Sequence, residues 1–413
     1  MTDIPACVAR YAERLHSALG DGHHVASPLG AWLLLALIAP AASGTARADL
    51  EEVLGTGAEA AADAARTLLA DPHPLVGAAT GLWQAGGVDS PGLASWRAGL
   101  PPSTQTGPLP DQATLDAWAR EHSLGLIERF PLKVRPEVLL VLASALATRV
   151  SWAEPFQVTG AEALGRGSAW AGRLRRVLRT PAHGHRAWVA ATDRAGDVIV
   201  HAAPARPTAE DGPGLLVVSV AAAADVPPGD VLAAAHEQAA HALDGDEPAG
   251  RRSLYDLPLG EAPLWTLREE TVRTFAVREE RVAAVLPCWS AESHHDLSAS
   301  ALGFPAAAEA FRALLARPDL GFEAAQAAAA RYGRYGFEAA AVTGFAMTVA
   351  LPPEAVRRTA ELRFGHPYAA VAVATDERFG TPGPWHGLPV FSAWVAEPED
   401  LPEADAADPP DTW

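Results

Sequence analysis

Residues 27–38 read SPLGAWLLLALI, a run of 12 residues without a charge, and the fold is argued outward from this stretch. Ser27 followed by Pro28 is typical of a helix start, where a hydroxyl caps the first turn and proline fits it. The run is too short for a membrane span, which needs about 18–20 apolar residues. A secretory signal would follow basic residues, whereas Glu13 and Asp21 precede this run. We therefore expect a buried core helix and, with no signal sequence, a cytoplasmic location.

Helical and strand patterns flank this segment on both sides. Apolar residues at helical spacing predict helices within residues 8–19, 45–54, 56–72 and 115–119. Residues 138–147 are apolar on both faces, which predicts a central strand covered on both sides. Further strands are predicted at residues 198–201, 215–220, 282–286, 368–374 and 390–395. Because strands and helices do not strictly alternate, the pattern favours an α+β fold with large mixed or antiparallel sheets.

The charge balance excludes two classes of partner. The chain has 32 Lys and Arg against 50 Asp and Glu, a formal net charge of −18. Nucleic acids and anionic membrane surfaces both require a basic footprint, so we expect neither as a partner. From Glu397 onward there are seven acids and no base, which predicts an acidic, disordered tail over residues 399–413. Cys7 and Cys288 are too few for a disulfide scaffold and are expected to be buried.

The histidines do not assemble a convincing metal or catalytic site. His236 and His241 are five residues apart, which places them about 140° apart on a helix, unlike a zinc-binding pair, so a surface helix is expected. His183 and His185 could share a strand face, but no third ligand is near, and we expect a loop. Residues 294–295 are expected in a solvated turn. We therefore expect no enzyme activity, cofactor or metal. A hydrolase using His183 and His185 with a loop nucleophile is the third hypothesis.

Short stretches distributed along the whole chain resemble one family, the serpins (serine protease inhibitors). The matching stretches are residues 27–30, 41–45, 49–55, 142–156, 286–303, 336–343 and 366–398, in the family's order. Of the 32 basic residues only Lys133 is a lysine, a bias typical of a GC-rich bacterial genome. The chain is thus identified as a divergent, bacterial-type member.

The resemblance implies one monomeric domain over residues 1–398, with three β-sheets, about nine helices and an exposed reactive loop. In family inhibitors a serine protease cleaves this loop, which then inserts into the main sheet and traps the acylated protease. The implied hinge consists of Gly336, Phe337, Glu338, Ala339, Ala340, Ala341, Val342 and Thr343. Family spacing places the reactive bond at Ala350–Leu351. A small residue before the cut favours elastase-like or subtilisin-like proteases.

The hinge can be analysed by strand alternation. A period of two places Phe337, Ala339, Ala341 and Thr343 on one face, which the family buries under the sheet. Alanine suits that face, but Phe337 requires a pocket where family inhibitors usually carry threonine.

Other departures bear on whether the chain inhibits. Arg334 and Tyr335 stand where family inhibitors usually carry acids, and the link to Pro367 is longer than usual. Ser144 and Gly30 replace the asparagine and serine usual beneath the main sheet.

Alternatives stay open for the target protease, the function and the location. Arg357 and Arg358 could attract trypsin-like proteases, although they lie far from the hinge. The alternative function is a non-inhibitory, serpin-like binding or scaffold protein. The alternative location, by family analogy, is extracellular.

Overall fold

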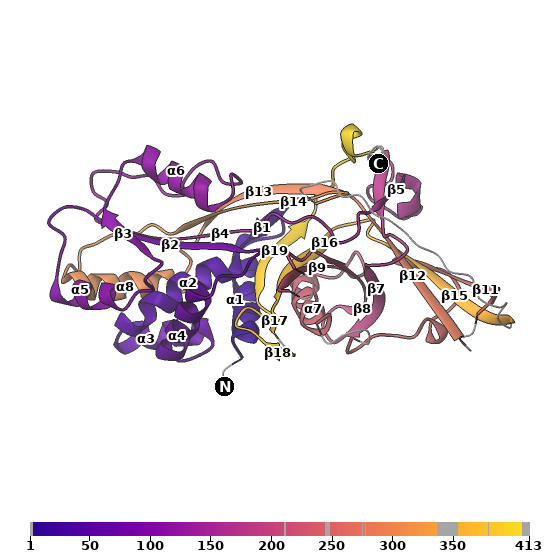
Figure 1. Cartoon of the computed structure of the whole chain (residues 1–413), viewed down its shortest axis with the longest axis horizontal. Helices are drawn as coiled ribbons and strands as arrows, with labels where there is room; N and C mark the ends of the chain where they lie inside the picture. The colour runs from indigo at the N-terminus through magenta and orange to yellow at the C-terminus, as the bar shows by residue number, and fades with distance from the viewer. Residues whose placement is uncertain are drawn as a thin grey trace.

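The computed structural model describes residues 3–209, 212–243, 248–274, 276, 278–336, 354–378 and 380–406. The molecule is elongated and of the α+β class, with a helical end and an end dominated by sheets (Figure 1). Within the described residues there are eight α-helices, against the nine or so expected. Their bounds are α1 (Ile4–Leu19), α2 (Pro28–Ile38), α3 (Gly44–Leu54), α4 (Ala58–Ala70), α5 (Pro91–Ala98), α6 (Gln112–His122), α7 (Pro228–His241) and α8 (Phe304–Leu315).

Helix α2 forms the core of the helical end. The hydroxyl of Ser27 accepts a hydrogen bond from the N–H of Gly30, and Pro28 occupies the first turn. All of its residues except Leu34 are buried, and Trp32 is completely so. Helices α1, α3, α4 and α8 pack around it. The predicted buried helix is therefore confirmed. Among the described residues no helix is both long and apolar enough to cross a membrane.

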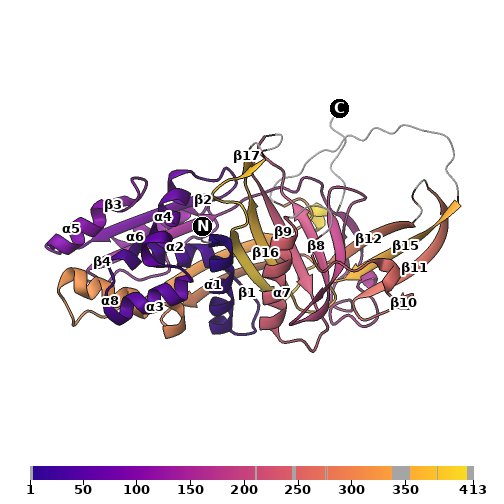
Figure 2. The same cartoon turned by 90° about the horizontal axis from the view of Figure 1, so that it is seen from below.

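A six-stranded sheet forms the centre of the molecule, in the order β1-β19-β16-β9-β8-β7. All eight residues of β9 are buried, because both faces of the sheet are covered. Helix α7 packs on one face, as Figure 2 shows, and the main core covers the other. The strand bounds are β1 (His24–Ala26), β7 (Arg186–Thr192), β8 (Gly196–Pro204), β9 (Gly214–Ala221), β16 (Tyr368–Thr375) and β19 (Pro389–Val395).

A second six-stranded sheet lies at the far end of the molecule, in the order β10-β11-β15-β12-β6-β5 (Figure 1). Its bounds are β5 (Gln157–Gly160), β6 (Arg176–Arg179), β10 (Gly260–Glu261), β11 (Trp265–Arg273), β12 (Arg278–Leu286) and β15 (Glu354–Arg363). A small hairpin joins β17 (Glu377–Arg378) to β18 (Thr381–Pro382). Strand β15 is paired on both edges, antiparallel with β11 and parallel with β12.

The third sheet is present as two separately paired parts. One part has the order β3-β2-β4, and the other pairs β13 with β14. Their bounds are β2 (Gly77–Gln84), β3 (Gln105–Pro108), β4 (Leu140–Ala147), β13 (Trp289–Asp296) and β14 (Ala325–Tyr332). The prediction for residues 138–147 is right about the strand but wrong about its environment. Strand β4 lies at the edge of its part, and five of its eight residues are half-exposed.

Candidate functional site

The gap between β4 and β14, here called the central seam, is the candidate site. The two strands run in the same direction, because the starts of both line one hollow, whereas the end of β14 and the residues that directly follow β4 line another. Strand β4 pairs with β2 and β14 pairs with β13, but in the described part of the chain no ladder joins β4 to β14. Unpaired strand edges are a template for an added strand. The seam therefore has the arrangement of a sheet with one strand position unfilled.

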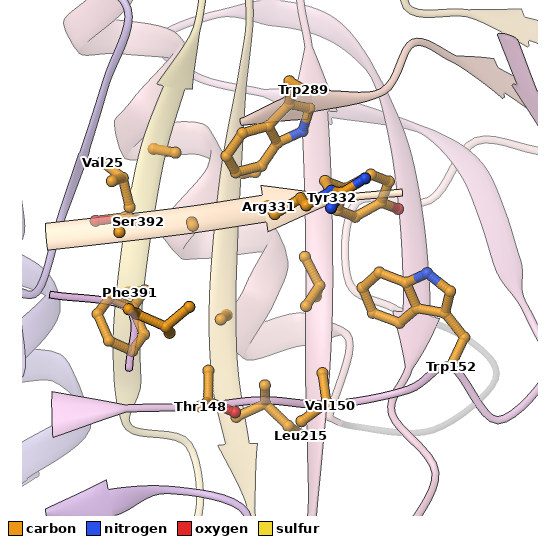
Figure 3. A pocket seen from close by; sticks show the side chains of 17 residues that line it. Val25, Thr148, Val150, Trp152, Leu215, Trp289, Arg331, Tyr332, Phe391 and Ser392 are labelled. Carbon is orange, nitrogen blue, oxygen red and sulfur yellow. The ribbon is translucent and has the colours of Figure 1, made fainter. Parts of the chain in front are cut away.

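An apolar cavity of 80 Å³ lies beneath the end of the seam at which β4 and β14 finish, here called the upper end. Figure 3 shows Thr148, Val150 and Trp152 on one side of it, with Trp289 and Tyr332 on the other. Strands of the central sheet form its floor. This cavity is smaller than the roughly 150 Å³ that accommodates a benzene ring in a protein core.

A larger hollow of 420 Å³ lies at the lower end of the seam, where both strands begin. Its wall is largely apolar and includes Phe130, Val141 and Phe311. Three cationic residues and two acidic ones also line it, namely Lys133, Arg135, Arg312, Glu137 and Glu323.

Helix α2 supports both sides of the seam through hydrogen bonds. The Ser144 hydroxyl on β4 donates to the carbonyl of Gly30 at 2.8 Å. Gln326 on β14 accepts from the N–H of Ser27 at 2.9 Å and donates to its carbonyl at 2.8 Å. The structure thus brings Ser144 and Gly30 into contact, as a pair beneath the sheet. The sequence reasoning missed Gln326, whose partner is 299 positions away in the chain.

A chain of neutral histidines lies below the seam. Nδ1 of His24 donates to the Gly22 carbonyl at 2.7 Å, so its Nε2 accepts from Nδ1 of His16 at 2.7 Å. Nε2 of His16 then accepts from the hydroxyl of Ser392, which lines the upper cavity, at 2.6 Å. Burial, followed by the neighbouring histidines, holds the pKa of His16 well below its ordinary value, and burial also lowers that of His24.

Two histidine predictions are wrong. His295 lies on β13 rather than in a solvated turn, is 8% exposed and donates through Nε2 to the carbonyl of Val25 at 2.7 Å. His236 lies on the buried side of α7 rather than on a surface, and burial lowers its pKa to about 4. Both residues are buried because the sheets enclose them, which helical or strand spacing alone does not reveal.

His183 and His185 lie in a loop, as predicted, and do not form a catalytic pair. The His183 side chain is 74% exposed and approaches only the Glu154 carboxylate, at 3.9 Å. Nε2 of His185 donates to the Glu154 carbonyl at 2.8 Å, and burial lowers the pKa of His185 to about 4. Its Nδ1 contacts Nε2 of His201 at 3.1 Å. Within the described ranges no group of three or more His, Cys, Asp or Glu residues could hold a metal ion.

The implied hinge begins at the upper end of the seam. Gly336 has a φ of 77° and pairs with Ser151, and a Cβ at this position would collide with the carbonyl oxygen of Val150. The remaining hinge positions, 337–343, and the bond Ala350–Leu351 lie outside the described residues. The predicted site is therefore placed at its first residue only.

The next described element is β15, which contains Arg357 and Arg358. Arg357 pairs with Glu279 at 3.0 Å and Glu270 at 3.5 Å, and Arg358 pairs with Glu269 at 2.9 Å. Their side chains are only 16% and 15% exposed. The structure thus places both arginines in a paired strand, where a protease has little access to them.

No family model matches this chain, and no curated protein matches its sequence. Solved structures match it by fold over nearly its whole length. Human thyroxine-binding globulin, complexed with its hormone, has a TM-score of 0.59 at 13% identity and covers 96% of this chain and 98% of its own. Serpin48 of the insect Tenebrio molitor has a TM-score of 0.57 at 14% identity, covering 97% and 100%. Arabidopsis AtSerpin1, in its native stressed conformation, has a TM-score of 0.56 at 16% identity, covering 96% and 99%.

Proposed function

We propose that this chain, which has the serpin fold, is a suicide-substrate inhibitor of serine proteases. The observation that carries the proposal is the central seam, where two strand edges without a partner among the described residues flank an unfilled strand position. The segment between Gly336 and Glu354 starts at the upper end of this seam. It is therefore the part of the chain best placed to fill the gap.

The length of this segment is sufficient for the proposed insertion. Residues 337–350 number 14 and, at about 3.3 Å per residue in a strand, span about 46 Å. Strand β14, with eight residues, spans about 26 Å by the same measure. While the segment stays joined to β15, part of it must return to that strand. Cleavage at Ala350–Leu351 removes this constraint, so insertion follows cleavage.

The proposed chemistry is that of the protease. Its serine attacks the carbonyl carbon of Ala350, the bond to Leu351 breaks, and the amine of Leu351 leaves with a proton. Ala350 remains esterified to the serine. Insertion then moves this ester away before water can hydrolyse it. The small side chain of Ala350 suits elastase-like or subtilisin-like proteases.

The alternative is a non-inhibitory binding protein, and the lower hollow favours it. Its 420 Å³ lies within the usual size of small-molecule sites, and Lys133 lies in its largely apolar wall. The other two cations of the wall, Arg135 and Arg312, are paired with Glu323 and Glu309. A ligand with an apolar body and an anionic group would fit this chemistry. Saturable binding of such a ligand, without any protease complex, would support this function instead.

The direct test mixes the protein with elastase, subtilisin and trypsin and examines the products on a denaturing gel. We expect a complex with elastase or subtilisin that resists denaturant. Trypsin serves as a negative control, because residues 337–353 contain no Lys or Arg. Cleavage without any complex would contradict the proposal.

A matched pair of hinge variants tests the insertion step. Ala341 belongs to the face expected under the sheet, whereas Ala340 belongs to the opposite face. Ala341→Arg should turn the inhibitor into a substrate that is cleaved without complex formation, since burying an unpaired charge is costly. Ala340→Arg should leave complex formation unchanged. Equal behaviour of the two variants would contradict insertion in this register.

A further inference from the structure

The C-terminal segment, residues 399–406, crosses the upper end of the central seam. The N–H of Glu399 donates to the carbonyl of Cys288 at 2.7 Å, beside the start of β13. The carboxylate of Asp400 accepts from the N–H of Arg176 at 2.9 Å and from Nε of Arg175 at 2.7 Å. Leu401 is 3% exposed. In Figure 1 the end of this segment lies above the end of β14, beside β5.

This packing corrects the prediction for the tail. Residues 399–406 were expected to be disordered and solvated, but Asp400 and Leu401 fix them to the body of the protein. Residues 407–413 lie outside the described residues. The acidic composition of the segment does not reveal this packing, because the hydrogen bonds of Asp400 and the burial of Leu401 are enough to hold it in place.

Arg334 connects this segment to the seam. It directly precedes Tyr335 and Gly336 and is 7% exposed. Its Nε donates to the carbonyl of Phe156 at 3.0 Å, and its Nη1 donates to the carbonyl of Asp405 at 2.9 Å. The guanidinium also lies over the Tyr335 ring, 4.9 Å from its centroid. One side chain therefore joins the β14 side of the seam to the chain that follows β4 and to the C-terminal segment.

Opening the upper seam would break these contacts. The N–H of Trp152 donates to the carbonyl of Tyr335 at 3.2 Å, and the N–H of Phe156 donates to that of Arg334 at 3.1 Å. These hydrogen bonds close the seam at its upper end only, since no ladder joins β4 to β14 in the described part of the chain. A strand that enters at this end must separate the two bonded segments by about 4.8 Å, the spacing of paired strands. A hydrogen bond does not survive such a shift. The contact from Arg334 to Phe156 must therefore be released when the seam opens.

We propose that residues 399–406 form a latch that holds Arg334 across the closed upper end of the seam and thereby controls how readily the hinge can enter the sheet. The proposal concerns the regulation of insertion and so rests on the proposed function. The latch itself is a property of the uncleaved protein. Its effect is measurable without any protease.

The test compares two truncations by amide hydrogen exchange. The chain ending at Pro402 keeps the anchors Asp400 and Leu401 but loses the carbonyl of Asp405. The control, ending at Ala406, loses only residues outside the described part. We expect exchange of the Trp152 and Phe156 amides to be about tenfold faster or more in the shorter chain, because a hydrogen bond to a charged group is lost. Equal exchange in the two chains would overturn the latch.

A second pair of variants in the full chain guards against misfolding of the truncation. Arg334→Met keeps the side-chain stem and removes both donated hydrogen bonds, and it should also speed exchange at Trp152 and Phe156. Arg317→Met is the control, because the Arg317 side chain is 54% exposed and pairs with Asp319 at 3.5 Å, outside the latch. Unchanged exchange in Arg334→Met would equally overturn the latch.

Protease mixing separates this proposal from the proposed function. If the latch operates, the chain ending at Pro402 should form the trapped complex faster than the control. Faster exchange with no complex in any chain would contradict inhibition and leave the latch in place. A trapped complex with unchanged exchange would support inhibition and contradict the latch.

Discussion

At the scale of single residues, Gly336 and Phe337 differ in the space that their side chains require. Gly336 occupies a left-handed conformation in which any side chain would meet the Val150 carbonyl. Phe337 follows directly in the sequence, and the cavity at this end of the seam, bordered by Val150 and Trp152, has a volume of 80 Å³. A phenyl ring needs more room than this cavity offers.

Phe337→Thr should therefore raise the yield of trapped protease complex. Forcing an oversized ring into a packed layer costs roughly 1–3 kcal/mol, and 1.4 kcal/mol on the insertion barrier slows the step about tenfold. Inhibition depends on insertion being faster than hydrolysis of the acyl-enzyme, so a slower step diverts molecules to simple cleavage. The measurement is the molar ratio of inhibitor consumed per protease trapped. A ratio near one in the unaltered protein, unchanged by Phe337→Thr, would show that the ring is accommodated.

At the scale of elements, β15 is held more firmly than a strand at a sheet edge would be. Strand β11 covers one of its edges and β12 the other, and both contribute glutamates to Arg357 and Arg358. A protease must bind a substrate backbone in extended form, and here both backbone edges are already paired.

We expect trypsin to leave the bonds after Arg357 and Arg358 intact in the folded protein. Mass spectrometry of the products of brief digestion gives the cleavage sites. The same digestion in urea provides the control, because unfolding releases β15 and both bonds should then be cut. Cleavage at either arginine with the circular dichroism spectrum unchanged would show that β15 detaches locally.

At the scale of the whole molecule, buried neutral histidines make stability depend on pH. His16, His24, His185, His201, His236 and His295 all have a pKa lowered by burial. The unfolded chain binds protons near pH 6.5, whereas the folded chain does so only at lower pH. Protonation of the unfolded chain therefore lowers the stability as the pH falls below 6.5, and for His185 and His236 this loss continues toward pH 4.

The free energy of unfolding should accordingly fall between pH 7 and pH 5. His236, with a pKa of about 4, contributes about 1.4 kcal/mol per pH unit below 6.5. Urea titrations at several pH values measure this slope, and His236→Gln should reduce it. His183→Gln is the matched control, because this histidine side chain is 74% exposed. A stability independent of pH over this range would contradict the neutral, buried state of these histidines.

Local pattern was sufficient for much of the fold. Residues 27–38 predict a buried helix because the run contains no charged residue, and α2 is that helix. Trp32, which lies in this helix, is 0% exposed. Cys7 and Cys288 are buried and unbridged, as expected. In each case the residues themselves carry the signal, since burial follows from their own hydrophobicity.

The candidate site depended on tertiary structure, because its contacts join distant parts of the chain. Strand β4 looks like a central strand in sequence, yet only the placement of β14 leaves its edge unpaired. The polar tail looks solvated, yet the carbonyl of Asp405 meets Arg334, 71 positions earlier. The sequence alone thus determined the buried helix α2 and those helices and strands whose hydrophobic pattern is continuous or periodic. The tertiary structure decided which edges stay open and which polar groups meet, since hydrogen bonding depends on distance in space and not along the chain.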